Sequence, residues 1–117
     1  MDSQVGDPQV RHYLDAIQNE ISSPQLSVAR LRGIVTDLLV FLSSRKGRTD
    51  VNCRAVDFEL MNNDGLWGRI DSIEAEDPLL ADVLGNMARA LHDTVSAPNV
   101  ARNFDSTPEQ LLERLGP

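Results

Sequence analysis

Hydrophobic residues recur at spacings of three and four along most of the chain, as they do on the buried face of a helix. The first of these stripes follows Asp7 and Pro8, a capping residue and a proline at the first helical position, and predicts a helix over residues 8–22. A second helix is predicted over residues 24–43, with Ser23 as its cap. Its apolar positions widen toward the C-terminal end until almost every face is hydrophobic, which indicates a central helix surrounded by others.

Two further hydrophobic stripes lie in the second half of the chain. Asp77 and Pro78 repeat the pattern of cap and proline and predict a helix over residues 78–95, which ends before Pro98. The last predicted helix, residues 107–115, is short and is expected to dock on the others through its leucines. Two capping boxes are candidates for its start: Ser106 with Glu109, or Thr107 with Gln110.

The middle of the chain is harder to assign. Apolar residues between Val51 and Leu60 alternate as in a strand, but they also share helical faces. Because the chain has no second alternating run with which a strand could pair, a helix over residues 50–61 is favoured. The next segment opens with the turn signal NNDG and contains a further glycine, so residues 62–77 are predicted to form a loop.

These elements predict an all-α fold, a bundle of about five helices in a single domain over residues 1–117, with residues 1–6 flexible. The composition agrees, because 41% hydrophobic and 25% charged residues are typical of a globular protein with one core. A single cysteine, Cys53, cannot form an intramolecular disulfide, and the first ten residues lack the features of a signal peptide. The longest apolar run, residues 34–42, is far short of the roughly 20 residues of a membrane span. A cytoplasmic protein that is not embedded in a membrane is expected.

The net charge of −7 is distributed unevenly along the chain. Residues 1–56 contain seven basic and six acidic side chains, a net charge of +1, whereas residues 57–117 contain four and twelve, a net charge of −8. Between Asp57 and Asp82 there are eight acidic residues and one basic residue, Arg69. Like charge opposes association, so neither nucleic acid nor an anionic membrane is an expected partner of this half.

Residues with catalytic or metal-binding chemistry are few. Cys53, His12 and His92 are spread over 80 positions, too dispersed to predict a zinc site, and no glycine-rich phosphate loop is present, so no metal or cofactor is expected. His92 and Asp93 are adjacent, and neighbouring residues on a helix point about 100° apart. His92 is therefore interpreted as a structural residue near a helix C-terminus and Cys53 as an inert thiol. The chain is not expected to be an enzyme.

Trp67 lies in the segment GLWG, between two groups of acidic residues. One interpretation makes it a lid on the core, and the other makes it an exposed aromatic anchor ringed by charge, which would dominate an interface. The neighbouring acids also have two interpretations. They could stabilise the N-terminus of the helix over residues 78–95 through its dipole, or they could attract a basic partner.

The dipole accounts for the acids next to that helix but not for the whole run, because a solvated surface normally mixes both signs of charge. The favoured hypothesis is therefore a small acidic protein that binds a basic protein partner. Immunity proteins and antitoxins that neutralise a nuclease-like toxin belong to this class. The alternative is a helical scaffold or regulatory module that forms a homodimer or a larger homo-oligomer through the helix over residues 24–43. The predicted partner-binding residues are Asp57, Glu59, Asp64, Trp67, Asp71, Glu74, Glu76, Asp77 and Asp82.

Overall fold

Six α-helices make up the regular structure of the chain over residues 7–96 and 107–116, the part that the computed structural model describes. Side chains are described for these residues except residues 50 and 88–96. The helices are α1 (Pro8–Ser22), α2 (Val28–Ser43), α3 (Asp50–Met61), α4 (Asp64–Glu76), α5 (Pro78–Ser96) and α6 (Pro108–Leu115). Within these residues there is no strand, so the all-α prediction is confirmed, as is the choice of helix over strand for residues 50–61.

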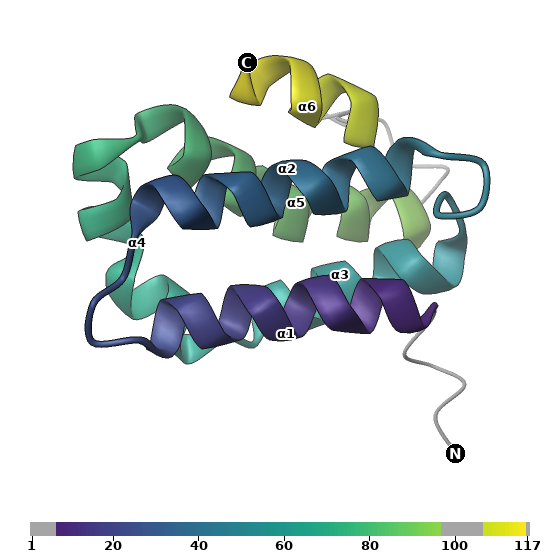
Figure 1. The fold of residues 1–117 in the computed structure, drawn as a ribbon. Helices are drawn as coiled ribbons and strands as arrows, with labels where there is room; N and C mark the ends of the chain where they lie inside the picture. The colour runs from purple at the N-terminus through teal and green to yellow at the C-terminus, as the bar shows by residue number, and fades with distance from the viewer. Residues whose placement is uncertain (1–6, 97–106, 117) are drawn as a thin grey trace.

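The helices stack in layers (Figure 1). α1 and α2 run antiparallel at the front, with α3 behind α1 and α5 behind α2. α6 lies across the top and packs on α2 and α5. α4 closes one end of the bundle against α5 and α1, at the end opposite the loop between α2 and α3.

One hydrophobic core collects side chains from all six helices. α2 contributes the largest share of them and buries seven of its sixteen residues. It packs mainly on α1 and α6 and leaves Val40 exposed, so it is not surrounded by other helices as predicted. α4 contributes only Leu66 and Ile73 from its thirteen residues. The predicted stripe of α1 is confirmed, since Val10, Leu14 and Ile17 are all buried.

Several predicted helix starts are confirmed by their hydrogen bonds. The Asp7 side chain accepts from the backbone N–H of Gln9 at 2.8 Å. At α6, Thr107 and Gln110 form the reciprocal capping box, with bonds of 2.9 and 3.2 Å. The predictions for residues 1–6 and for Pro98 lie outside the described residues.

The loop between α2 and α3 is held close to α1. Buried Asn52 accepts from the backbone N–H of Asp7 at 2.8 Å and donates to the carbonyl of Gly47 at 2.9 Å. Gly47 itself sits against the end of α2, where a Cβ atom would overlap the backbone carbonyl of Phe41. A glycine is required there because no side chain fits.

The predicted start of the second helix is wrong by four residues. Ser27, not Ser23, caps α2 and accepts from the backbone N–H of Arg30 at 3.2 Å. Ser23 instead ends α1. The turn between them is fixed by the buried carboxylate of Glu20, which accepts from the backbone N–H of Ser27 at 2.8 Å, and this contact is not apparent from local sequence patterns.

The predicted loop over residues 62–77 is also wrong, because most of this segment is helix α4. The side chain of Asn63 caps it by accepting from the backbone N–H of Leu66 at 3.0 Å. Leu66, Ile70 and Ile73 are spaced four and three apart and turn one face toward the core. The apolar stripe outweighs the turn signal, and the turn itself is confined to Asn62 and Asn63, the two residues before the helix.

Candidate protein-binding surface

The nine predicted partner-binding residues fall into different environments, and one of them is inside the protein. Asp57 is 3% exposed on α3 and so lies away from any docking surface of the folded chain. Three others, Glu59, Asp77 and Asp82, form ion pairs with arginines. The remaining five, Asp64, Trp67, Asp71, Glu74 and Glu76, all belong to α4 and are exposed.

Two of the bridged acids are neutralised by arginines from distant helices. Nη1 of Arg11 on α1 donates to Glu59 on α3 at 3.0 Å, and this hydrogen bond raises the pKa of Arg11. Nη2 of Arg114 on α6 lies 3.0 Å from the carboxylate of Asp82 on α5. Both acids therefore join two helices of the bundle, and their negative charge is compensated within the fold.

Asp77 is the most extensively bonded of these carboxylates. Arg32 on α2 donates to its two oxygens, from Nε at 2.7 Å and from Nη2 at 3.2 Å. The backbone N–H of Leu80 donates to it at 3.2 Å, so Asp77 also caps α5 as predicted. The hydrogen bond from Arg32 lowers the pKa of Asp77 below its ordinary value of 3.8, despite the opposing effect of burial. Asp77 thus fastens the turn between α4 and α5 to α2.

The exposed residues of α4 form a stripe. Asp64, Trp67, Asp71 and Glu74 follow one another at steps of three, four and three, which brings them to the same side of the helix. We call these four residues the acidic stripe. Glu76, two positions beyond the last of them, points elsewhere. None of the three stripe carboxylates forms an ion pair or a hydrogen bond with any described residue.

Arg69, the basic residue of this segment, does not neutralise the acidic stripe. It lies two positions from Trp67 and from Asp71, toward the opposite side of α4. Its Nη1 donates to the backbone carbonyl of Ser23 at 2.9 Å, so its charge is directed to the end of α1.

Glu74 and Glu76 lie just before α5, as the dipole interpretation requires, but they also meet the opposite end of the dipole of α4. Both lie in the last turn of α4, which has no basic residue. Acidic side chains are unfavourable at a helix C-terminus, because the carbonyl groups there carry partial negative charge. Within the acidic stripe, Glu74 is therefore present at a cost to the stability of its own helix, whereas Asp64 in the first turn is favourably placed.

Trp67 is an exposed residue, with 38% of its surface accessible, and does not close the core. Its indole Nε1 donates to the backbone carbonyl of Met61 at 3.0 Å, which holds the ring against the end of α3. Met61 and Phe58 on α3 are 50% and 66% exposed. Sequence reasoning missed both, although their spacing of three on a helix was a signal that they share a face.

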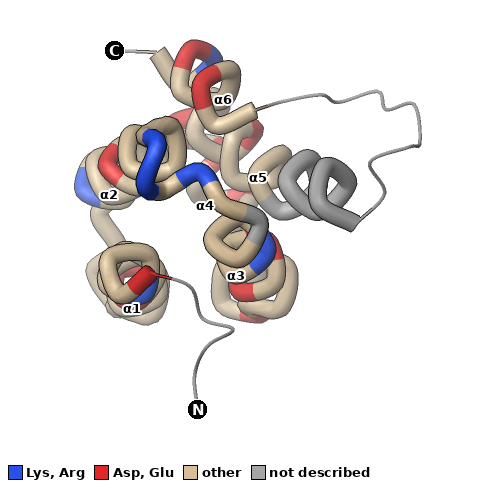
Figure 2. Tube along the Cα trace, turned by 90° about the vertical axis from the view of Figure 1, so that its right-hand side faces the viewer, with Lys and Arg blue, Asp and Glu red and all other residues tan. Residues whose placement is uncertain are grey.

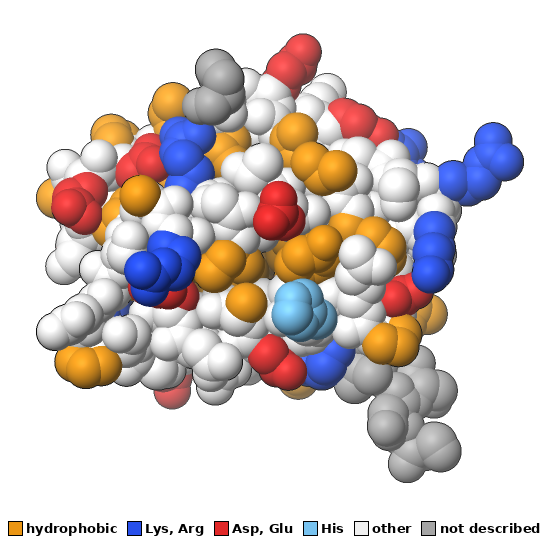
Figure 3. Space-filling view, in the orientation of Figure 1, with side chains coloured by type: hydrophobic (Ala, Val, Ile, Leu, Met, Phe, Trp, Pro, Cys, Tyr) orange, Lys and Arg blue, Asp and Glu red, His pale blue; other side chains and the backbone are white. Residues whose placement is uncertain are grey.

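Acidic residues elsewhere are dispersed. In Figure 2 they occur on α1, α2, α3 and α6, one or a few at a time. Figure 3 shows the face formed by α1 and α2, where hydrophobic side chains lie between the helices and the acidic side chains are spaced apart. The acidic stripe is distinct because its three carboxylates all lie on one side of a single helix.

The described residues contain no cluster of three His, Cys, Asp or Glu side chains that could hold a metal ion. The side chain of His92 lies outside the described residues, and Cys53 is half-buried beside the core. Within residues 7–96 and 107–116, no helix is both long enough and apolar enough to cross a membrane.

Comparison of the chain with models of protein families, with curated proteins and with solved structures finds no match.

Proposed function

We propose that this chain is a non-catalytic binding protein that docks a basic protein surface through the acidic stripe of α4. The observation that carries the proposal is the exposed row of Asp64, Asp71 and Glu74 around Trp67, which no cation of the described part of the chain compensates. Because Glu74 lowers the stability of its own helix, its placement is most simply explained by a use outside the folded chain.

The two kinds of residue in the acidic stripe have complementary roles in docking. Unpaired carboxylates attract a cationic surface over a distance of about 10 Å and speed its association. Trp67 then supplies apolar contact area, with its ring already oriented by the bond to Met61. Exposed Met61 and Phe58 extend this contact area onto α3.

The partner that fits this chemistry is a protein with a cation-rich groove. A nuclease-like toxin has such a groove for its nucleic acid, and carboxylates would occupy it in place of phosphates. On this proposal the chain acts in the cytoplasm as a neutraliser of the immunity-protein or antitoxin type.

Self-association through α2 is less well supported. The crowded apolar residues that suggested it, including Leu38, Leu39 and Leu42, are buried in the core of the same chain. Val40 is the exposed large hydrophobic residue that this helix retains, at 53%.

The proposal is tested by reversing the charges of the acidic stripe. The variant Asp64→Lys/Asp71→Lys/Glu74→Lys should fail to capture the basic protein that the wild type retains from its native host at low salt. The matched control is Asp37→Lys/Glu76→Lys/Glu113→Lys, which reverses three other exposed carboxylates without ion pairs among the described residues. The control should capture the same protein as the wild type.

Association rates with the captured protein provide the quantitative readout. The stripe variant should associate about tenfold more slowly than the control at low salt and at a similar rate at high salt, because salt screens exposed charges. Equal rates for the two variants at low salt would refute docking through α4.

A further inference from the structure

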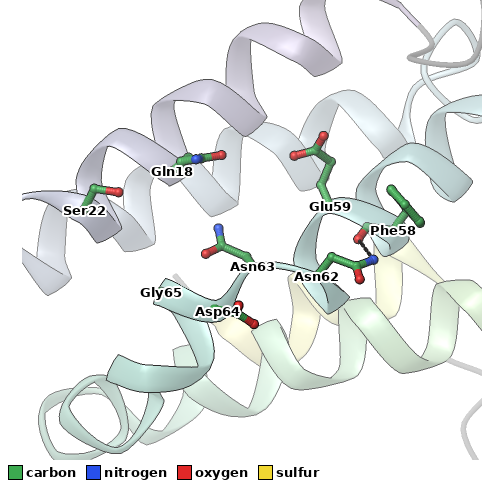
Figure 4. Close-up of a pocket in the computed structure, with 8 residues that line it drawn as sticks. All are labelled: Gln18, Ser22, Phe58, Glu59, Asn62, Asn63, Asp64 and Gly65. Atoms are coloured by element: carbon green, nitrogen blue, oxygen red, sulfur yellow. Dashed lines mark hydrogen bonds between the residues drawn. The ribbon is translucent and has the colours of Figure 1, made fainter.

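A pocket of 330 Å³ lies beside the acidic stripe, between the C-terminal half of α1, the end of α3 and the start of α4. Figure 4 shows Gln18 and Glu59 facing each other across it, with Asn63 between them. Its lining residues are Gln18, Ser22, Phe58, Glu59, Asn62, Asn63, Asp64 and Gly65. Asp64 belongs both to this lining and to the acidic stripe, so the two surfaces are continuous.

The side chains around the pocket offer acceptor oxygens on Gln18, Glu59, Asn62 and Asp64, and Asn63 adds an N–H donor because its own oxygen caps α4. Among the described residues, the side chains of Gln18, Ser22 and Asp64 have no hydrogen-bond partner. Arg11 occupies Oε2 of Glu59, which leaves the other oxygen available. The amide nitrogen of Asn62 donates to the backbone carbonyl of Phe58 at 2.8 Å, which leaves its oxygen available. No lining residue is a lysine or an arginine.

We infer that this pocket receives an arginine side chain of the protein that docks on the acidic stripe. The inference rests on the proposed function and specifies the partner's chemistry at one position. A guanidinium carries five N–H donors in a planar fork, which suits acceptor oxygens presented from three helices. A lysine ammonium has three donors on a single atom and reaches fewer of them.

The size and charge of the pocket agree with this occupant. Its volume lies at the lower end of the range for small-molecule sites, which suits one side chain better than a cofactor. The carboxylate of Asp64 has no partner among the described residues and favours a cation, and the oxygen of Glu59 that Arg11 does not bind adds a further acceptor. The ring of Phe58 points away from Gln18 and Glu59, so the recognition is by hydrogen bonds and charge rather than by stacking (Figure 4).

Two labelled peptides test the inference on the full chain: nine lysines, and the same peptide with a central arginine. Their charges are equal, so a difference in affinity reports the guanidinium. The wild type should bind the arginine peptide about fivefold more tightly at low salt, as measured by fluorescence anisotropy. Equal affinity of the wild type for the two peptides, or no binding of either, would overturn the inference.

Blocking the pocket should abolish this preference without changing the net charge. Gln18→Trp fills the pocket at an exposed position, and Asn19→Trp places the same ring at the neighbouring exposed position outside it. In Gln18→Trp the two peptides should bind with about equal affinity. In Asn19→Trp the arginine peptide should still bind more tightly. A preference retained in Gln18→Trp would also overturn the inference.

A second pair of variants does not depend on a large substitution. Asp64→Asn and Glu76→Gln each remove one exposed carboxylate of α4, but only Asp64 lines the pocket. Asp64→Asn should weaken binding of the nine-lysine peptide and reduce the arginine preference, whereas Glu76→Gln, outside the acidic stripe, should change neither appreciably. An equal preference in the two variants would count against the pocket.

The pocket and the docking on α4 can fail separately. One outcome is that the triple reversal of the acidic stripe abolishes binding of both peptides while the wild type shows no arginine preference. This outcome would support docking on α4 and refute the arginine pocket. If the triple reversal changes neither affinity, docking on α4 falls, and the inference that rests on it falls as well.

Discussion

Glu74 and Asp77 are three residues apart in the sequence and lie in opposite environments. Asp77 is held by Arg32 and caps α5, whereas Glu74 is exposed on α4 without a partner among the described residues. The fold thus divides one acidic run into carboxylates that join helices and carboxylates that face outward. The same division separates Glu59 and Asp82 from Asp64 and Asp71, although all belong to one run of negative charge.

The largest expected effect compares the buried side of α4 with an exposed apolar residue of the next helix. Ile73 is fully buried, so Ile73→Ala should lower the free energy of unfolding by about 2–5 kcal/mol in urea denaturation. Leu79→Ala removes a similar side chain that is 51% exposed at the start of α5 and should have a much smaller effect. Equal losses would mean that α4 is not anchored through Ile73.

An intermediate effect is expected at Asp77. Asp77→Asn keeps a good capping residue but removes the charge that pairs with Arg32. Because this ion pair is only partly exposed, the substitution should lower the free energy of unfolding by about 1–2 kcal/mol at neutral pH.

The same substitution should change the pH dependence of stability. Because the pKa of Asp77 is lowered in the folded state, its contribution is complete above the ordinary value of 3.8 and is lost as the pH falls through the folded value. Unfolding curves of wild type and Asp77→Asn measured between neutral and strongly acidic pH should therefore converge below this value. A constant difference across the range would show that the ion pair does not stabilise the fold.

The smallest effect has the opposite sign. Glu74→Gln removes a negative charge from the C-terminal turn of α4 and should raise the free energy of unfolding by about 0.3 kcal/mol at low salt. Asp37→Asn is the control, because Asp37 lies in the middle of α2, away from both ends of the dipole. A loss of stability in Glu74→Gln would indicate that this carboxylate supports the fold and is not reserved for a partner.

The helices with both a cap and a continuous apolar stripe could be predicted from the sequence. α1 and α6 show this, because Asp7 and Thr107 are local signals and act on residues two or three positions away. α4 was missed because the turn residues before it and the glycines within it masked a short stripe of Leu66, Ile70 and Ile73. A helix held by so few apolar residues leaves a weak periodic signal.

The candidate site could be predicted only in part. The sequence indicated that the acidic residues and Trp67 lie together, but it could not indicate which acids are neutralised. Arg32 and Asp77 are 45 positions apart, and Arg11 and Glu59 are 48 apart, so these pairs exist only once the helices have packed. The three carboxylates of the acidic stripe remain because no arginine among the described side chains pairs with them.

The bond from Trp67 to Met61 has a practical consequence. Trp67 is the only tryptophan of the chain, so the intrinsic emission of the protein comes from the corner where α3 meets α4. Emission wavelength and quenching by small solutes depend on how much water reaches the indole. Titrating an unlabelled partner while recording this emission would thus observe the surface directly, with the native chromophore as the only probe.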